Sequence, residues 1–90
     1  MVTIMQVSVP ATIGQHSAMM PEGARGLSVM NWISVEMIAY IIADTARPMQ
    51  PRTFHVVGVG TDITDVVRRH GRFVGSVKMD RSYHVFLEDF

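Results

Sequence analysis

PRTFHVVGVG, residues 51–60, is the stretch from which the expected fold of this 90-residue chain follows. It begins with a proline, carries Phe54 and two valines, and breaks at Gly58 and Gly60. Aromatic and β-branched residues between proline and glycine predict a strand that is entered from a loop and left through a tight turn. Ile63 stands where a dinucleotide-binding loop has its third glycine, so we interpret the two glycines as a strand-exit turn.

Two segments on the N-terminal side also predict strands. Residues 3–9 alternate, with Met5, Val7 and Val9 on one face, which is typical of a half-buried strand, and Pro10 ends it. Residues 15–20 predict a shorter second strand. The tight turn after it contains a proline and a glycine, which favour its backbone angles.

Residues 26–42 fit two different structures. Their apolar positions recur at helical spacing, yet the run is also rich in β-branched and aromatic side chains. The second option is a pair of strands at residues 25–32 and 36–43, joined near Ile33-Ser34-Val35. Periodicity alone leaves both options open.

The segment TDITDVVRRHG, residues 61–71, predicts one helical turn near residues 62–69. Thr61 or Asp62 can cap its start, and Gly71 can end it. Basic residues near a helix C-terminus commonly complement the helix dipole, but a guanidinium is also suited to binding phosphate. The dense basic cluster here comprises Arg68, Arg69 and Arg72.

The C-terminal part of the chain predicts a β-hairpin. Residues 72–79 and 82–88 both alternate, and the first run places Phe73, Gly75 and Val77 on one face. Only Asp80-Arg81 separates the runs, so we expect a two-residue hairpin loop.

Composition narrows the class of protein. Eight basic and eight acidic residues cancel, so we expect no general nucleic-acid binding. Asn31 and Glu36 interrupt the most apolar run, so we expect no membrane span. The absence of cysteine suits a reducing cytoplasm, and the four histidines lack metal-ligand spacing, so we expect neither a metal nor a cofactor. The length fits one domain, residues 1–90.

Short landmarks in a fixed order resemble a family of short, largely uncharacterised bacteriophage-encoded β-rich proteins. The landmarks are Pro21-Glu22-Gly23-Ala24-Arg25, Tyr40-Ile41-Ile42-Ala43-Asp44, Arg52-Thr53-Phe54, Val57-Gly58-Val59-Gly60, Phe73-Val74-Gly75 and His84-Val85-Phe86. The resemblance implies a compact all-β domain, and therefore favours two strands in the ambiguous region. It implies action in the host bacterial cytoplasm and supplies no catalytic residues.

We therefore predict an all-β fold: a small antiparallel β-sandwich or partly open barrel of six or seven short strands, with one helical turn. Exposed strand edges and the apolar composition predict self-association as a dimer or higher oligomer.

The functional hypothesis is a phage-encoded anti-defence factor without catalytic activity. In this hypothesis it sequesters a nucleotide-type immune signal in a cleft between copies. Its aromatic side chains would stack a base, and its arginines would hold phosphates. The candidate ligand-binding residues are Trp32, Tyr40, Arg47, Arg52, Arg68, Arg69 and Arg72. The alternatives are a stoichiometric inhibitor that binds a host defence protein and a structural or assembly accessory of the virion.

Overall fold

The computed structural model describes residues 1–33 and 35–89. The described chain is all-β with one short helix. Its elements are β1 (Val2–Pro10), β2 (Gly14–Pro21), β3 (Arg25–Ile33), β4 (Glu36–Asp44), β5 (Met49–Val57), α1 (Thr64–Arg68), β6 (Gly71–Lys78) and β7 (Ser82–Glu88).

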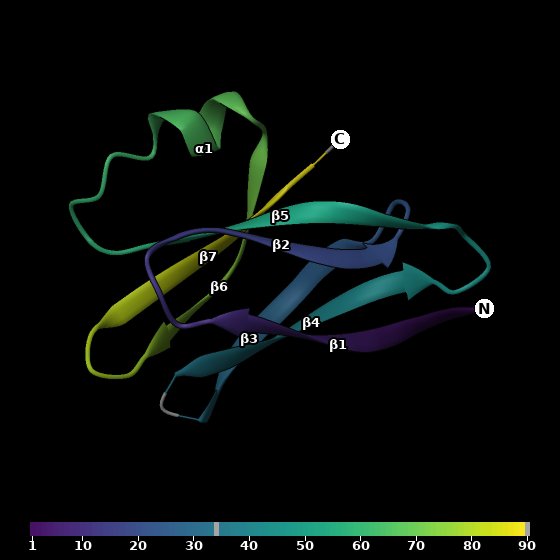
Figure 1. Ribbon diagram of the computed structural model, residues 1–90, viewed down its shortest axis with the longest axis horizontal. Helices are drawn as coiled ribbons and strands as arrows, with labels where there is room; N and C mark the ends of the chain where they lie inside the picture. Colours follow the sequence, from purple (N-terminus) through teal and green to yellow (C-terminus); the bar gives the residue numbers. More distant parts are fainter. Residues whose placement is uncertain (34, 90) are drawn as a thin grey trace.

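The strands form two antiparallel sheets that do not close into a barrel (Figure 1). Sheet A has the order β1-β4-β3, and sheet B has the order β2-β5-β7-β6. The predicted all-β sandwich of six or seven strands is therefore confirmed. The stretch 51–60 supplies most of β5, which lies between β2 and β7.

The ambiguous region forms two strands, β3 and β4, as the resemblance implied. In β4, every second side chain from Met37 to Ala43 is buried, and the residues between them are only partly covered. That period of two matches the pleat of a strand, not the 3.6-residue repeat of a helix. Ser34, in the predicted joint, lies outside the described residues.

The core lies between the two sheets. Its largest fully buried side chains include Phe54 from β5 and Met20 and Met37 from β2 and β4. Two glycines let the sheets approach where β3 passes β6. A Cβ at Gly75 would lie 2.9 Å from Cγ1 of Val29, and one at Gly26 would lie 2.6 Å from Cγ2 of Val74. No side chain fits at either position without movement of the neighbouring strand.

The hairpin prediction is wrong in two details. Lys78 pairs with Ser82, so three residues rather than two form the loop. A β-bulge between Phe73 and Gly75 also shifts the alternation, because an extra residue changes which face the side chains occupy. Phe73 is consequently 59% exposed, whereas Val74 is buried.

The predicted helical turn is present, but its ends differ from the prediction. The N-cap residue is Ile63, which makes no side-chain capping bond, and Asp62 instead accepts hydrogen bonds from the Thr64 amide and hydroxyl. At the other end, Gly71 was expected to end the helix, but the residue with a positive φ is His70, at 56°. Gly71 already belongs to β6, where a Cβ would lie 2.5 Å from Cγ1 of Val66.

Candidate functional site

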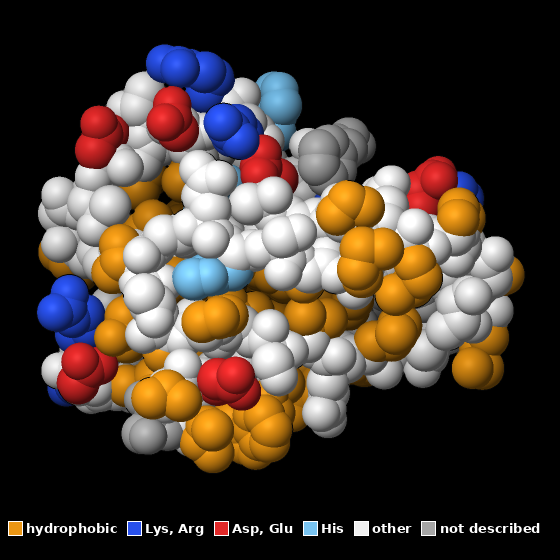
Figure 2. Space-filling model, in the orientation of Figure 1, with side chains coloured by type: hydrophobic (Ala, Val, Ile, Leu, Met, Phe, Trp, Pro, Cys, Tyr) orange, Lys and Arg blue, Asp and Glu red, His pale blue; other side chains and the backbone are white. Residues whose placement is uncertain are grey.

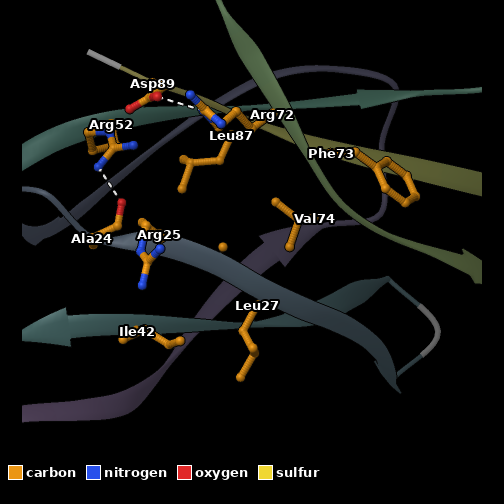
Figure 3. A pocket seen from close by; sticks show the side chains of 11 residues that line it. Ala24, Arg25, Leu27, Ile42, Arg52, Arg72, Phe73, Val74, Leu87 and Asp89 are labelled. Carbon is orange, nitrogen blue, oxygen red and sulfur yellow. Dashed lines mark hydrogen bonds and ion pairs between the residues drawn. The ribbon is translucent and has the colours of Figure 1, made fainter.

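A half-open cleft of about 760 Å³ lies where the beginning of β3 faces the beginning of β6 (Figure 3). Three arginines and one aspartate bring polar groups to its lining, and aliphatic side chains make much of the rest. The polar residues are Arg25, Arg52, Arg72 and Asp89, and the aliphatic ones include Leu27, Ile42, Val74 and Leu87.

Arg52 links sheet B to the turn before β3 at one side of this cleft (Figure 3). Its side chain projects from β5 and is 4% exposed. The Nη1 group donates to the carbonyl of Ala24 at 2.9 Å, and Nε and Nη2 donate to the carbonyl of Glu88 at 3.1 and 2.7 Å. Burial lowers the pKa of the guanidinium, while the carboxylates of Asp89 and Glu88 oppose that shift. Arginine stays protonated in proteins, so this end of the cleft carries a positive charge.

Arg72 and Arg25 are more accessible than Arg52. The Nε group of Arg72 donates to Oδ2 of Asp89 at 2.6 Å, and its side chain remains 79% exposed. Arg25 is exposed and has no hydrogen-bond or ion-pair partner for its side chain among residues 1–33 and 35–89. The cleft therefore contains one exchangeable ion pair and one exposed cation.

Figure 3 shows how these groups are distributed. Arg52, Arg72 and Asp89 lie together on one side, and Arg25 lies across the gap from them. Leu27 and Ile42 lie on the far side of Arg25 from that group. A ligand with a negative end and a flat apolar end matches this division, because guanidinium groups bind oxyanions and aliphatic side chains pack against apolar surface.

The structure brings together two of the residues that the sequence predicted for ligand binding. Arg52 and Arg72 both line the cleft. The others lie elsewhere. Trp32 and Tyr40 are on β3 and β4, Arg47 pairs with Glu22, Arg68 pairs with Asp65, and Arg69 lies 3.9 Å from Glu88.

Arg25 is the lining cation that the sequence interpretation missed. It follows the turn at residues 21–24 and begins an edge strand. Nothing in its neighbourhood along the chain distinguishes it from an ordinary solvated arginine. Its proximity to Arg72 arises only when β3 packs beside β6, so no local signal was present.

A second polar cluster lies on the outer side of sheet B, under the segment between β5 and β6. His55 and Glu88 are both buried there, with Nε2 of His55 3.2 Å from Oε2 of Glu88. The contact is not aligned as a hydrogen bond, and no other described residue provides one for that nitrogen. The pair becomes an ion pair only when His55 is protonated. Figure 2 shows charged side chains concentrated around α1.

The described residues contain no group of three or more His, Cys, Asp and Glu side chains that could hold a metal ion. None of the described helices is long and apolar enough to cross a membrane.

Fold and cleft together define a small seven-stranded β-sandwich with an arginine-lined opening between its sheets. The chain belongs to the family described as a domain of unknown function, DUF7352, whose model matches residues 1–89. Neither the curated proteins nor the solved structures contain a significant match.

Proposed function

We propose that this protein binds a phosphate-bearing, nucleotide-sized ligand in the cleft and does not transform it. The observation that carries the proposal is the placement of Arg25, Arg52 and Arg72, from three different strands, around one opening. Strands far apart in the sequence supply these cations, so their clustering is a property of the fold rather than of a local basic run.

The chemistry of the lining favours phosphate and an organic group together. Guanidinium groups offer paired donors that match phosphate oxygens. The volume of about 760 Å³ lies within the range typical of small-molecule sites. A phosphate would replace Asp89 on Arg72 and approach the exposed Arg25, while a base or ribose would lie along Leu27 and Ile42.

The finer hypothesis is sequestration of a nucleotide immune signal in a phage-infected bacterium. The resemblance to short phage-encoded proteins supports this biological setting. A protein that binds without cleaving needs only a stable cleft, and the buried Arg52, bonded to Ala24 and Glu88, stiffens this one. The site of action in this hypothesis is the host cytoplasm.

The test is ligand capture followed by release. The purified protein is incubated with cyclic dinucleotides and cyclic ADP-ribose isomers, washed and heated, and the released compound is identified by mass. An intact compound supports sequestration, and a degraded one indicates an enzyme. Arg25→Ala and Arg72→Ala are each expected to weaken capture by roughly tenfold or more. Arg68→Ala, on α1 and outside the cleft lining, is the matched control and is expected to bind normally.

The alternative candidate is a stoichiometric inhibitor that binds a host defence protein. The observation in its favour is the turn between β3 and β4, where Trp32 is 56% exposed and Val35 is 64% exposed. Figure 2 shows hydrophobic side chains gathered at this end of the molecule. Exposed tryptophan is a common anchor in protein interfaces. Retention of no compound across the panel would place this candidate first.

A further inference from the structure

We infer that the outer face of sheet A is the interface of a two-fold dimer of this chain. We define this face by the apolar side chains that project from β1, β4 and β3 away from the core: Ile4, Met30, Ile33, Ile38, Tyr40 and Ile42. The inference goes beyond ligand binding, and the face meets the cleft at Arg25 and Ile42, which belong to both.

Strand register places these side chains together. Ile4 pairs with Ile42, and Met30 pairs with Ile38, so each pair points to the same side of the sheet. Tyr40 lies in the row between them, and its hydroxyl donates to Sδ of Met30 at 3.2 Å. Ile4 is 59% exposed and Met30 is 49% exposed. No described element covers this face, because the core, β5 and β7 all lie on the other side of sheet A.

The charges near the face lie at its two ends and have opposite signs. Arg25 pairs in register with Ile42 at one end, and Glu36 pairs with Ile33 at the other. Neither side chain has an ion-pair partner among residues 1–33 and 35–89. Asp44, beside Arg25, is already paired with the ammonium group of Met1 at 3.2 Å. The face therefore combines apolar rows, a middle row in which Gln6 and Ser28 flank Tyr40, and charges at the rim, which is the mixed composition of many protein interfaces.

This arrangement is complementary to itself. A two-fold axis that runs across the strands turns a second copy end for end. The Arg25 end of one copy then faces the Glu36 end of the other, and the contact occurs twice. Face-to-face sheets pack about 10 Å apart, which long arginine and glutamate side chains can span. Arg25 has five N–H donors, so an ion pair with Glu36 leaves donors for a ligand in the cleft.

The area of the face fits a weak dimer. Three strands of nine residues make a surface of about 30 by 14 Å, or about 420 Å² in projection per copy. Side-chain relief increases the accessible area above that projection, so two copies bury on the order of 1,000 Å² in total. That value lies at the lower end of specific interfaces, so we expect dissociation in the micromolar range.

Sedimentation velocity over a micromolar to millimolar concentration series tests the interface. The native chain is expected to shift from monomer to dimer across the series. Ile38→Asp puts a charge at the centre of the face and is expected to weaken dimerisation by at least about a hundredfold. Lys78→Asp, an exposed position on β6 outside the face, is the matched control and is expected to dimerise as the native chain does. Circular dichroism confirms that each variant remains folded.

A charge exchange tests the two-fold arrangement itself. Glu36→Arg is expected to weaken dimerisation about tenfold or more, because it faces Arg25 of the second copy. The double variant Arg25→Glu with Glu36→Arg restores opposite charges and is expected to recover most of the lost affinity. A native chain that stays monomeric throughout, or an Ile38→Asp variant that still dimerises, would overturn the inference. A double variant no tighter than Glu36→Arg would overturn the proposed axis. Ligand capture by Glu36→Arg is expected to be normal, which separates this result from the proposed function.

Discussion

The outer sides of the two sheets differ in whether another part of the chain covers their outward-facing side chains. Each strand buries one set of alternate side chains and presents the other set outward. On sheet B, residues 58–70, between β5 and β6, fold back over the sheet, and we call this segment the cover. Val66, His55 and Glu88 are buried on that outer side. On sheet A, no described element folds back, and apolar side chains such as Ile4 remain exposed. The difference shows that the covered side buries polar groups such as His55 and Glu88, whereas the uncovered side presents apolar side chains to solvent.

Glu88 is the centre of the covered region. Its carbonyl accepts two hydrogen bonds from Arg52, and its carboxylate lies 3.2 Å from His55 and 3.9 Å from Arg69 of the segment after α1. Glu88, at the end of β7, therefore contacts the buried Arg52, His55 of sheet B and Arg69 of the cover. The outer face of sheet A has no such residue among those described, and only packing against a partner would bury it.

The largest predicted effect on stability comes from removing the hydrogen bonds that Arg52 donates to Glu88 and Ala24. Arg52→Met retains the aliphatic volume but removes three hydrogen bonds, and leaves the carbonyls of Ala24 and Glu88 without those donors. We expect a loss of about 3 kcal/mol in the free energy of unfolding, measured by urea denaturation. Arg47→Met, which removes one exposed ion pair with Glu22, is the control and should change stability by less than about 0.5 kcal/mol. Equal effects of the two substitutions would contradict the structural role of Arg52.

The next effect comes from lifting the cover away from sheet B. In Gly71→Ala, the new methyl group would lie 2.5 Å from Cγ1 and 2.9 Å from the carbonyl oxygen of Val66, so α1 must move. We expect a loss of about 2 kcal/mol in unfolding free energy. Gly58→Ala is the matched control, because its nearest contact would be an ordinary 3.4 Å to Ile13. If both variants were equally stable, α1 would not be packed against β6 as described.

Much of the sheet could be predicted because strand alternation is a local property. The pattern at residues 3–9 and the proline and glycine at the ends of 51–60 correspond to β1 and β5. Residues 26–42 were harder, because several apolar neighbours satisfy both the helical and the strand period. The resemblance resolved that choice, and the alternating burial of β4 confirmed it.

The errors arose where one residue alters a pattern or where distant strands meet. The bulge at Val74 places Phe73 outside and Val74 inside, and the alternation did not show it, although Gly75 is a residue type that often marks a bulge. The helix was expected to end at Gly71, because glycine is common at that place, whereas His70 carries the positive φ. The cleft was missed as a single-chain site because Arg25 and Arg72 come together only through the packing of β3 beside β6.

Two valines allow a direct comparison of the covered outer side of sheet B with the uncovered outer side of sheet A. Valine to threonine replaces one methyl group by a hydroxyl of similar size, so its effect depends on what surrounds the side chain. Val66→Thr, at a residue of the cover that is 5% exposed, is expected to lose about 1.5 kcal/mol. Val2→Thr, at a strand position that is 67% exposed on the outer side of sheet A, is expected to change stability by less than about 0.5 kcal/mol. Denaturation at protein concentrations low enough to keep the chain monomeric measures both, and a larger effect at Val2 would reverse the comparison.

The smallest predicted effect on stability concerns Asp62, just before α1, and it depends on pH. The hydroxyl and amide of Thr64 donate to Oδ1 of Asp62 at 2.6 and 2.9 Å, and these bonds lower the pKa of Asp62 below its ordinary value of 3.8. Because the folded value is depressed, the stabilisation is fully present above pH 3.8 and is lost as the pH falls through the lower, folded value. Asp62→Asn keeps an acceptor oxygen but cannot titrate, so it should lack this small stabilisation at neutral pH and should also lack this part of the acid dependence. The measurement is the difference in unfolding free energy between the two proteins from neutral pH down through this range. The native chain should lose its advantage only in the acid part, and a difference that stays constant with pH would show that the charge of Asp62 does not stabilise the first turn of α1.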